Sequence, residues 1–218
     1  MTNGATTKLL RYLFFAVVVR AVILVALGLT VRHRERLPKK GPAVLAANRN
    51  SHLDTLALMS LFPLRLLPHL RPVAAADYFL KPGFMGWFVT NIIGIIPVER
   101  GSAGKGGNPL SACEEALDRG DILIIFPEGS RGEPEAFAQF KKGIGHLARA
   151  RVNVPVIPVF MHGLGKALPK DSFLLVPFNC DVIAGEKLTW QGDMNGFMET
   201  LQSRMSDLAG QIHMSPWE

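Results

Sequence analysis

The residues best suited to chemistry lie in the segment 48–54, which reads NRNSHLD. The apolar run 43–47 precedes this segment, and a periodic apolar stretch that Pro63 closes follows it, which predicts a strand, a polar loop and a helix. Open α/β sheets place their chemistry at such joints between a strand end and a helix start. This position makes His52 and Asp54 candidates for an acid/base pair.

The same segment also has a purely structural interpretation. Ser51 and Asp54 have the spacing of a capping box, in which the acidic side chain accepts from the backbone N–H of the cap residue. His52 and Asp54 are two residues apart, so on a regular helix they point away from each other. A His52–Asp54 dyad would require an irregular first turn, and both interpretations of Asp54 stay open at this point.

Length and charge narrow the class of protein. The 218 residues are enough for one domain with a substantial core, and the net charge is +6 although only 19% of residues are charged. The basic residues are scattered among apolar ones, which favours an anionic membrane surface as partner and argues against nucleic acid. Cys113 and Cys180 have no metal-ligand spacing. We therefore expect a reducing compartment, no structural metal and no nucleic-acid partner.

The N-terminal run from Leu9 to Val31 is predominantly apolar and carries Arg20 near its middle. It predicts either a tilted membrane span or a helical hairpin that lies in one leaflet. We favour the hairpin because Arg20 divides the run into pieces too short to span separately. The basic residues after Val31 predict that the rest of the chain faces the cytoplasm. The expected organisation is a membrane anchor over 1–40 and a catalytic domain over 41–218.

Charged residues also follow two further predicted strands. The apolar strand 122–126 leads into PEGSRG, which contains Glu128 and Arg131, and GIIPVER ends with Arg100. An arginine at a strand end can hold a phosphate group through two parallel hydrogen bonds. Glu128 and Arg131 could instead pair with each other at the surface.

Two other stretches carry expectations about exposure. Segment 79–96 predicts a core helix that runs into a core strand, with the alternative that Phe84, Trp87 and Phe88 form an exposed apolar face beside the active site. Between Pro63 and segment 79–96, Arg65, His69 and Arg71 are expected in a loop with outward basic side chains. A helix over 195–212 is predicted from apolar residues spaced three and four apart.

Taken together, five blocks resemble the glycerolipid acyltransferase family typified by 1-acylglycerol-3-phosphate acyltransferases. The blocks are NRNSHLD at 48–54, GIIPVER at 94–100, FPEGSR at 126–131, FKKG at 140–143 and VPVIPV at 154–159. The resemblance covers about residues 40 to 185. It implies an α/β fold with a central, mostly parallel or mixed sheet flanked by helices. It also implies acyl transfer from acyl-CoA or acyl carrier protein to a lysophospholipid hydroxyl, at a membrane of phospholipids and without a cofactor.

The resemblance assigns roles to particular residues. It implies that a histidine base works with Asp54, which orients the imidazole and steadies its charge. It implies that the phosphate and glycerol region of the acceptor is held by Arg100, Glu128, Gly129, Ser130, Arg131 and Lys141. Within this set, Glu128 is expected to orient a neighbouring arginine or hydroxyl group.

One residue departs from the family pattern. Alignment on Asn48 and Asp54 puts Arg49 where the family has its catalytic histidine. An arginine keeps its proton at workable pH and cannot act as a general base. Three explanations stand: Arg49 is an introduced substitution, the protein is a naturally impaired relative, or His52 has taken over as base. The catalytic candidates are therefore Arg49, His52 and Asp54.

The expected activity is acylation of 1-acylglycerol 3-phosphate to phosphatidic acid, impaired by Arg49. One alternative is a catalytically silent lipid-binding relative that keeps the anchor and the phosphate site. Another is an acyltransferase for a different acceptor, such as a lyso-ornithine lipid. The expected location is the cytoplasmic face of the inner (plasma) membrane.

Overall fold

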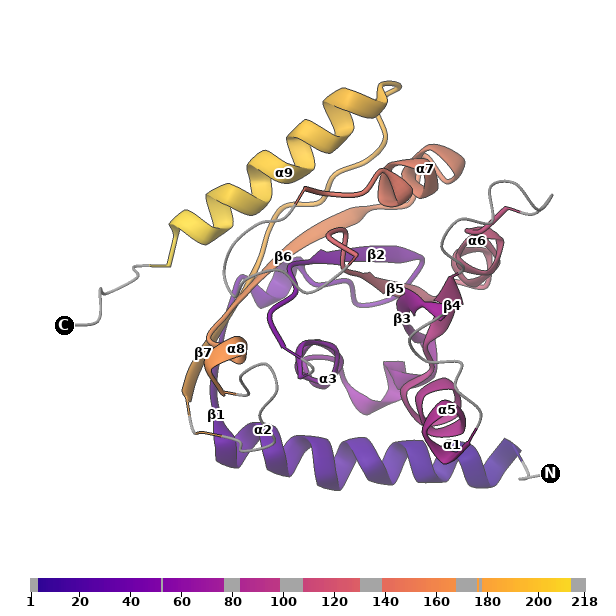
Figure 1. Cartoon of the computed structure of the whole chain (residues 1–218), viewed down its shortest axis with the longest axis vertical. Helices are drawn as coiled ribbons and strands as arrows, with labels where there is room; N and C mark the ends of the chain where they lie inside the picture. Colours follow the sequence, from indigo (N-terminus) through magenta and orange to yellow (C-terminus); the bar gives the residue numbers. More distant parts are fainter. Residues whose placement is uncertain are drawn as a thin grey trace.

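The structure is a computed structural model that describes residues 4–51, 53–76, 83–98, 108–129, 139–167, 176 and 178–212. In these ranges the chain forms a seven-stranded sheet with helices on both faces, in the order β1-β7-β6-β2-β5-β3-β4 (Figure 1). The strands are β1 Leu27–Arg32, β2 Ala43–Ala47, β3 Leu70–Ala75, β4 Ile96–Val98, β5 Ile122–Ile125, β6 Val156–His162 and β7 Phe178–Ala184. Strands β6 and β7 are antiparallel and the other neighbours are parallel. The predicted α/β fold with a mixed, mostly parallel sheet is confirmed.

The helical segments of the described part cover the two faces of this sheet. They are α1 Gly4–Leu13, η1 Phe14–Val19, α2 Arg20–Ala26, η2 Arg34–Arg36, α3 Asp54–Ser60, η3 Leu64–His69, α5 Phe84–Phe88, η4 Val89–Ile93, α6 Ser111–Asp118, α7 Gly143–Ala150, α8 Leu164–Ala167 and α9 Met194–Gly210. Helices α6, α7 and α9 lie on one side of the sheet, and α1, α2 and α3 lie on the other (Figure 1).

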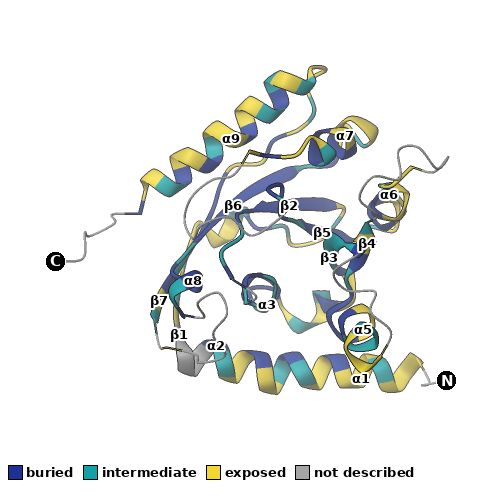
Figure 2. Cartoon of the chain, in the orientation of Figure 1, coloured by how far each residue is buried: buried dark blue, intermediate teal, exposed yellow. Residues whose placement is uncertain are grey.

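The central strands are buried on both faces, which explains their uninterrupted apolar sequences (Figure 2). Along β2, Ala43, Leu45 and Ala47 join the core beneath α3 and the N-terminal helix, whereas Val44 and Ala46 join the core beneath α6, α7 and α9. This alternation follows from the two-residue period of a strand. The rigid centre of the sheet thereby fixes the positions at which β2, β5 and β6 end.

The N-terminal helical segment packs against the body of the protein. Arg11, Phe15, Val19 and Ile23 recur every four residues and are all buried. The expected helical run also ends earlier than its apolar sequence does, because residues from Leu27 onward pair with β7 as an edge strand. Apolar character alone does not distinguish a buried strand from a helix.

Among the described residues, no helix combines the length and the apolar character needed to cross a membrane. The anchor over 1–40 stays a prediction.

Arg11 attaches the N-terminal helix to the backbone of β3 and η4. Its guanidinium donates to the carbonyl oxygens of Leu70 at 3.1 Å and Ile93 at 3.2 Å. Burial lowers the pKa of Arg11 to about 10; the positive charge of Arg71 adds to this lowering and Asp121 opposes it. Gly94, at φ +81°, allows the guanidinium to approach, since a Cβ there would lie 2.8 Å from Nη1 of Arg11.

The expectation of an outward basic loop around residue 70 is wrong for Arg71. This residue lies in β3, and its Nε donates to buried Asp121 at 3.3 Å. His69 Nδ1 lies 3.1 Å from the same carboxylate. Pro72 argued against a strand here, because proline is rare in strand interiors.

The helix predicted over 195–212 is confirmed as α9.

Candidate active site

The candidate site lies at the edge of the sheet where β2, β5 and β6 end. These three strands are parallel to one another, so their carboxyl ends meet at one edge. Strand β2 ends at Ala47, and α3 begins at Asp54. The prediction of a strand, a loop and a helix is therefore confirmed, and the loop that joins them faces the residues that follow β5.

Asn48 ties this loop to the end of β6. Its side-chain nitrogen donates to the carbonyl oxygen of Met161 at 2.9 Å, and its side-chain oxygen accepts from the N–H of Met161 at 2.7 Å. Asn50 Nδ2 donates to the same carbonyl at 2.7 Å. Both asparagines position the loop and were absent from the predicted site. An asparagine directly after a buried strand is the signal that could have identified them.

Asp54 is 1% exposed and holds the loop from the other side. Its Oδ2 accepts from the backbone N–H of Asn50 at 2.6 Å and from that of Ser51 at 2.7 Å. The contact with Ser51 is the carboxylate half of the predicted capping box, but α3 begins at Asp54 with Leu53 at its N-cap, so Asp54 holds the loop and Ser51 does not cap the helix. The catalytic role of Asp54 stays a prediction.

Arg49, in the loop after β2, contacts the segment that follows β5. The central guanidinium carbon of Arg49 is 5.2 Å from the centroid of the Phe126 ring, within the range of a cation–π contact. Phe126 follows β5 directly and leads to Glu128. Arg49 is thus packed against Phe126, the first residue of the FPEGSR block.

Glu128 is the unusual group of this site. It is 3% exposed, and neither of its carboxylate oxygens has a hydrogen bond of ordinary length and angle among the described residues. Burial raises the pKa of Glu128 to about 7, and the Asp54 carboxylate adds to this rise. The backbone N–H of Arg49 and its guanidinium oppose the rise. Glu128 can therefore change protonation state near neutral pH.

Gly129 and Lys141 lie against each other beside this carboxylate. Gly129 has φ +70°, and a Cβ at this residue would come within 2.8 Å of Cε and Nζ of Lys141. The backbone N–H of Lys141 donates to the carbonyl oxygen of Pro127 at 2.9 Å. The predicted substrate residues Glu128, Gly129 and Lys141 are thus brought together, with the Lys141 ammonium next to the turn.

Four predicted site residues lie outside the described part of the chain. They are His52, Arg100, Ser130 and Arg131. Of the other predicted residues, Arg49, Asp54 and Glu128 interact electrostatically, and Lys141 covers the turn after Glu128. Their roles in catalysis and substrate binding stay predictions.

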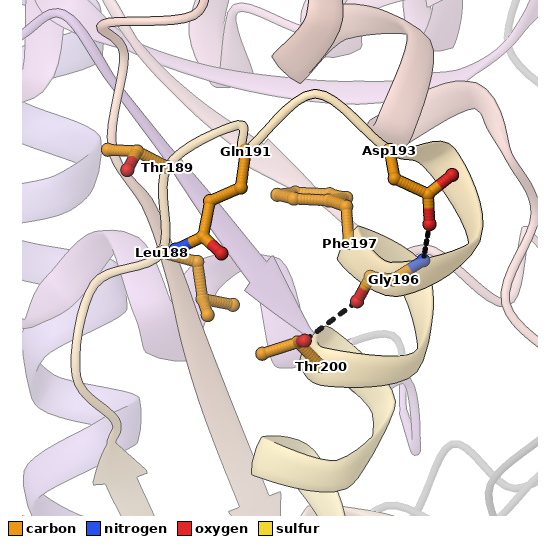
Figure 3. Close-up of a pocket in the computed structure, with 7 residues that line it drawn as sticks. All are labelled: Leu188, Thr189, Gln191, Asp193, Gly196, Phe197 and Thr200. Carbon is orange, nitrogen blue, oxygen red and sulfur yellow. Dashed lines mark hydrogen bonds between the residues drawn. The ribbon is translucent and has the colours of Figure 1, made fainter.

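A small pocket elsewhere is distinct from this site (Figure 3). It is lined by Leu188, Thr189, Gln191, Asp193, Gly196, Phe197 and Thr200. Leu188 bridges to Val156, the first residue of β6, which places the pocket at the opposite edge of the sheet. Asp193 there accepts from the N–H of Gly196 at 2.6 Å and so caps α9. Within the ranges that the structure describes, no group of three or more metal-ligating side chains is assembled.

Comparison with known proteins decides the family. The family model described as Acyltransferase matches residues 28–162, which is more than half of the chain. The chain belongs to this acyltransferase family. The match begins in β1, ends with β6 and includes Arg49, Asp54 and Glu128.

Curated members of the acyltransferase family share part of their length with this chain. A chloroplastic 1-acyl-sn-glycerol-3-phosphate acyltransferase, LPAT1 of Arabidopsis thaliana, is 32% identical over 139 residues, which are 63% of this chain and 37% of that protein. The 1-acyl-sn-glycerol-3-phosphate acyltransferase alpha of Mus musculus is 31% identical over 160 residues, which are 73% of this chain and 52% of that protein. The chain thus matches about half or less of the length of these relatives.

A solved structure of another acyltransferase shows the same fold. The crystal structure of the 1-acyl-sn-glycerophosphate acyltransferase PlsC from Thermotoga maritima superposes with a TM-score of 0.72 at 18% identity. The superposition covers 99% of this chain and 85% of that one. At this level of identity, the likeness concerns the fold.

Proposed function

We propose that this protein transfers a fatty acyl group from an acyl thioester to the free hydroxyl of 1-acylglycerol 3-phosphate, giving phosphatidic acid. The observation that carries the proposal is the meeting of Arg49, Asp54 and Glu128 at one edge of the sheet in an acyltransferase chain. The named reaction of the matched relatives in Arabidopsis and mouse supports the acceptor.

The chemistry requires a proton acceptor and two substrates, acyl-CoA or acyl carrier protein as donor and a lysophospholipid as acceptor. The acceptor oxygen loses its proton and attacks the thioester carbon, and the C–S bond then breaks to release the thiol. Because the oxygen attacks directly, no covalent acyl-enzyme and no resident cofactor are needed. The side chains of this site act by positioning and by moving one proton.

Positive charge beside the turn at Gly129 suits a phosphate-bearing acceptor. The Lys141 ammonium lies against this turn, and ammonium groups bind phosphate oxygens well. Arg100, Ser130 and Arg131 complete the proposed phosphate and glycerol contacts, as the family resemblance implies. Charge neutralisation by these residues would favour lysophosphatidic acid over an acceptor without a phosphate.

Arg49 favours a second candidate function. A side chain that only donates hydrogen bonds stands where the family has its base, and loss of a positioned base slows such reactions by about 10²- to 10⁴-fold. A silent lipid-binding relative is therefore the rival to a slow acyltransferase.

Thiol release tests the proposed function directly. The protein with Arg49 and its Arg49→His variant are compared with acyl-CoA or acyl carrier protein as donor and lysophosphatidic acid in detergent micelles as acceptor. We expect transfer by both forms and a gain in the variant, up to about 10²-fold. Transfer by neither form with either donor would leave the silent lipid-binding function. Preference for lyso-ornithine lipid would reassign the acceptor.

We further propose that the protein works at an anionic membrane surface on the cytoplasmic side. The N-terminal helical segment and α5 expose several large apolar side chains, namely Leu9, Leu10, Tyr12, Leu13, Val17, Val18, Phe84 and Met85. The rings of Phe88 and Phe14 pack edge-on with their centroids 5.1 Å apart, which joins α5 to the N-terminal helical segment. Lys8 and Arg20 are also exposed on this segment. Apolar side chains with nearby cations suit binding at the headgroup boundary.

Vesicle binding tests this surface. Val17 is 62% exposed within it, and Val152, beyond α7, is 47% exposed on the other side of the sheet. We expect Val17→Glu to weaken co-sedimentation with phosphatidylglycerol-containing vesicles and Val152→Glu to leave it unchanged. Equal binding by both variants would show that the membrane contact lies elsewhere.

A further inference from the structure

We propose that Glu128 is the general base of this particular chain, accepting the proton of the acceptor hydroxyl in the role that the family gives to histidine. This inference rests on the proposed acyl transfer. It assigns proton transfer to Glu128, which was expected only to orient a neighbouring arginine or hydroxyl group.

The other groups at the sheet edge are poorly suited to this step. Arg49 remains protonated and only donates hydrogen bonds. Asp54 Oδ2 is occupied by the N–H groups of Asn50 and Ser51, at 2.6 and 2.7 Å. Asp54 therefore serves to hold the loop, and a proton bound at either of its oxygens would remove the negative charge that these two N–H groups bind.

Glu128 has the geometry of an available base. Its carboxylate is 3% exposed, and its two oxygens have no hydrogen bond of ordinary geometry among the described residues. Buried polar groups are nearly always hydrogen-bonded, so a buried carboxylate whose contact with the N–H of Arg49 falls outside ordinary hydrogen-bond geometry is a candidate for a functional use. Glu128 also follows β5, which pairs with β2, and β2 ends at Ala47, two residues before Arg49.

The surroundings of Glu128 match the demands of proton transfer near neutral pH. Burial raises the pKa of Glu128 to about 7, while the N–H and the guanidinium of Arg49 act in the opposite direction. A base is most effective when its pKa is close to the working pH. Arg49 thus contributes a charge that keeps a buried Glu128 ionisable, although it cannot take a proton itself.

The proposed step balances without any additional reactant. The Glu128 carboxylate takes the proton of the acceptor hydroxyl as the acceptor oxygen forms a bond to the thioester carbon. The C–S bond then breaks, and its electron pair leaves with the sulfur as a thiolate. The protonated Glu128 returns the proton to the thiolate, which restores the carboxylate and releases the free thiol.

A double-mutant cycle tests the assignment. Thiol release is measured for the unmodified protein, Glu128→Gln, Arg49→His and the double variant, with the exposed Glu115→Gln as matched control. We expect Glu128→Gln to lower kcat by about 10²- to 10⁴-fold in the protein that carries Arg49. In the Arg49→His background the same change should lower kcat less than about tenfold, because the imidazole supplies a base.

The other possible outcomes distinguish a general base from a residue that only positions the substrate or the protein. An equal loss in both backgrounds would show that Glu128 only positions substrate or protein. A silent unmodified protein with an active Arg49→His variant would also overturn the base role while leaving the acyltransferase function intact. Transfer that survives Glu128→Gln but is lost in His52→Gln would assign the base to His52. Silence of every form with both donors would instead remove the proposed function.

A second variant covers the possibility that Glu128→Gln folds poorly. Glu128→Asp keeps the carboxylate but shortens its reach, so we expect a lower kcat with a retained loss of rate at acid pH. Far-ultraviolet circular dichroism establishes folding for both variants. A pH profile without an acid limb in Glu128→Asp and in the unmodified protein would contradict the base role.

Discussion

Asn48 and Met161 form two reciprocal hydrogen bonds across the ends of neighbouring parallel strands. The side-chain amide of Asn48 donates to the Met161 carbonyl at 2.9 Å and accepts from the Met161 N–H at 2.7 Å. The amide group therefore imitates a further residue pair of the β2–β6 ladder, one step beyond Ala47. Because Arg49 directly follows Asn48 in the chain, the position of Arg49 depends on these two hydrogen bonds.

Removal of this pair should destabilise the protein. Asn48→Ala leaves the buried N–H of Met161 without its acceptor, so we expect a loss of about 2 kcal/mol in the free energy of unfolding and a lower kcat. The measurement is urea unfolding together with thiol release. Asn91→Ala is the control, because the amide of exposed Asn91 donates to the Trp87 carbonyl one helical turn away and its loss should change stability by less than about 0.5 kcal/mol. Equal losses in the two variants would contradict a special role for Asn48.

The turn at Gly129 makes a second prediction. Gly129→Ala introduces both a left-handed conformation for alanine and a clash with the Lys141 side chain, whereas Gly120→Ala at φ +80° has open space around its Cβ. We expect both variants to lose about 1 kcal/mol from the backbone and Gly129→Ala to lose more. Thermal unfolding measures the difference. If Lys141→Ala in the Gly129→Ala protein restores no stability, the close approach of the two residues is not the cause.

Glu128 predicts a pH dependence of stability with a definite sign. The folded protein holds the pKa of Glu128 at about 7, above the ordinary 4.5. The stability of the unmodified protein should therefore fall as pH rises from about 4.5 to 7 and change little above that. Glu128→Gln removes this loss. At pH 8 the variant should be more stable by up to about 3 kcal/mol, and the two proteins should converge near pH 4. Urea unfolding at several pH values measures this, and a variant less stable at pH 8 would contradict it.

Arg49 should tune the protonation of Glu128. The guanidinium acts to lower the pKa of this carboxyl, against the effect of burial, so Arg49→Met should raise that pKa. The acid limb of the kcat profile would then move to higher pH. The Phe126 ring packs on Arg49 and has no charge to replace it. An acid limb at the same pH in both proteins would separate Arg49 from the ionisation of Glu128.

Arg11 should matter for stability far more than the other arginine of the N-terminal helix. Arg11→Met leaves the carbonyl oxygens of Leu70 and Ile93 without their donor, which should cost about 2 kcal/mol or more. Arg20 is exposed, and Arg20→Met should change the free energy of unfolding by less than about 0.5 kcal/mol. Chemical unfolding of both variants gives the comparison. A similar effect of the two changes would mean that Arg11 does not fix the helix.

Much of the strand and helix pattern could be predicted from residue order alone. The apolar runs of β2 and β5 are buried on both faces, and the spacing of Phe197, Leu201, Met205 and Leu208 is that of α9. These elements are encoded locally, because strand and helix periods place their apolar residues on defined faces. The order of the motif blocks likewise indicated the family before the fold was known.

The sequence was less informative wherever a residue's role depends on distant neighbours. Arg71 was expected to point outward and Arg11 carried no prediction, yet both are held by groups far away in the chain. Strand β1 was hidden in an apolar run, since its pairing with β7 is a long-range event. Neither feature has a local signal, because hydrogen bonds between distant segments exist only after the chain has folded.

The candidate site shows the same division. The sequence by itself determined which residues stand at the strand ends, including the arginine in the histidine position. Only the tertiary structure decided that Glu128 is buried near Arg49 and Asp54, with a pKa near 7. The physical reason is that residue type sets a group's ordinary acidity, whereas desolvation and neighbouring charges, which arise when β2 and β5 come together, set its actual acidity.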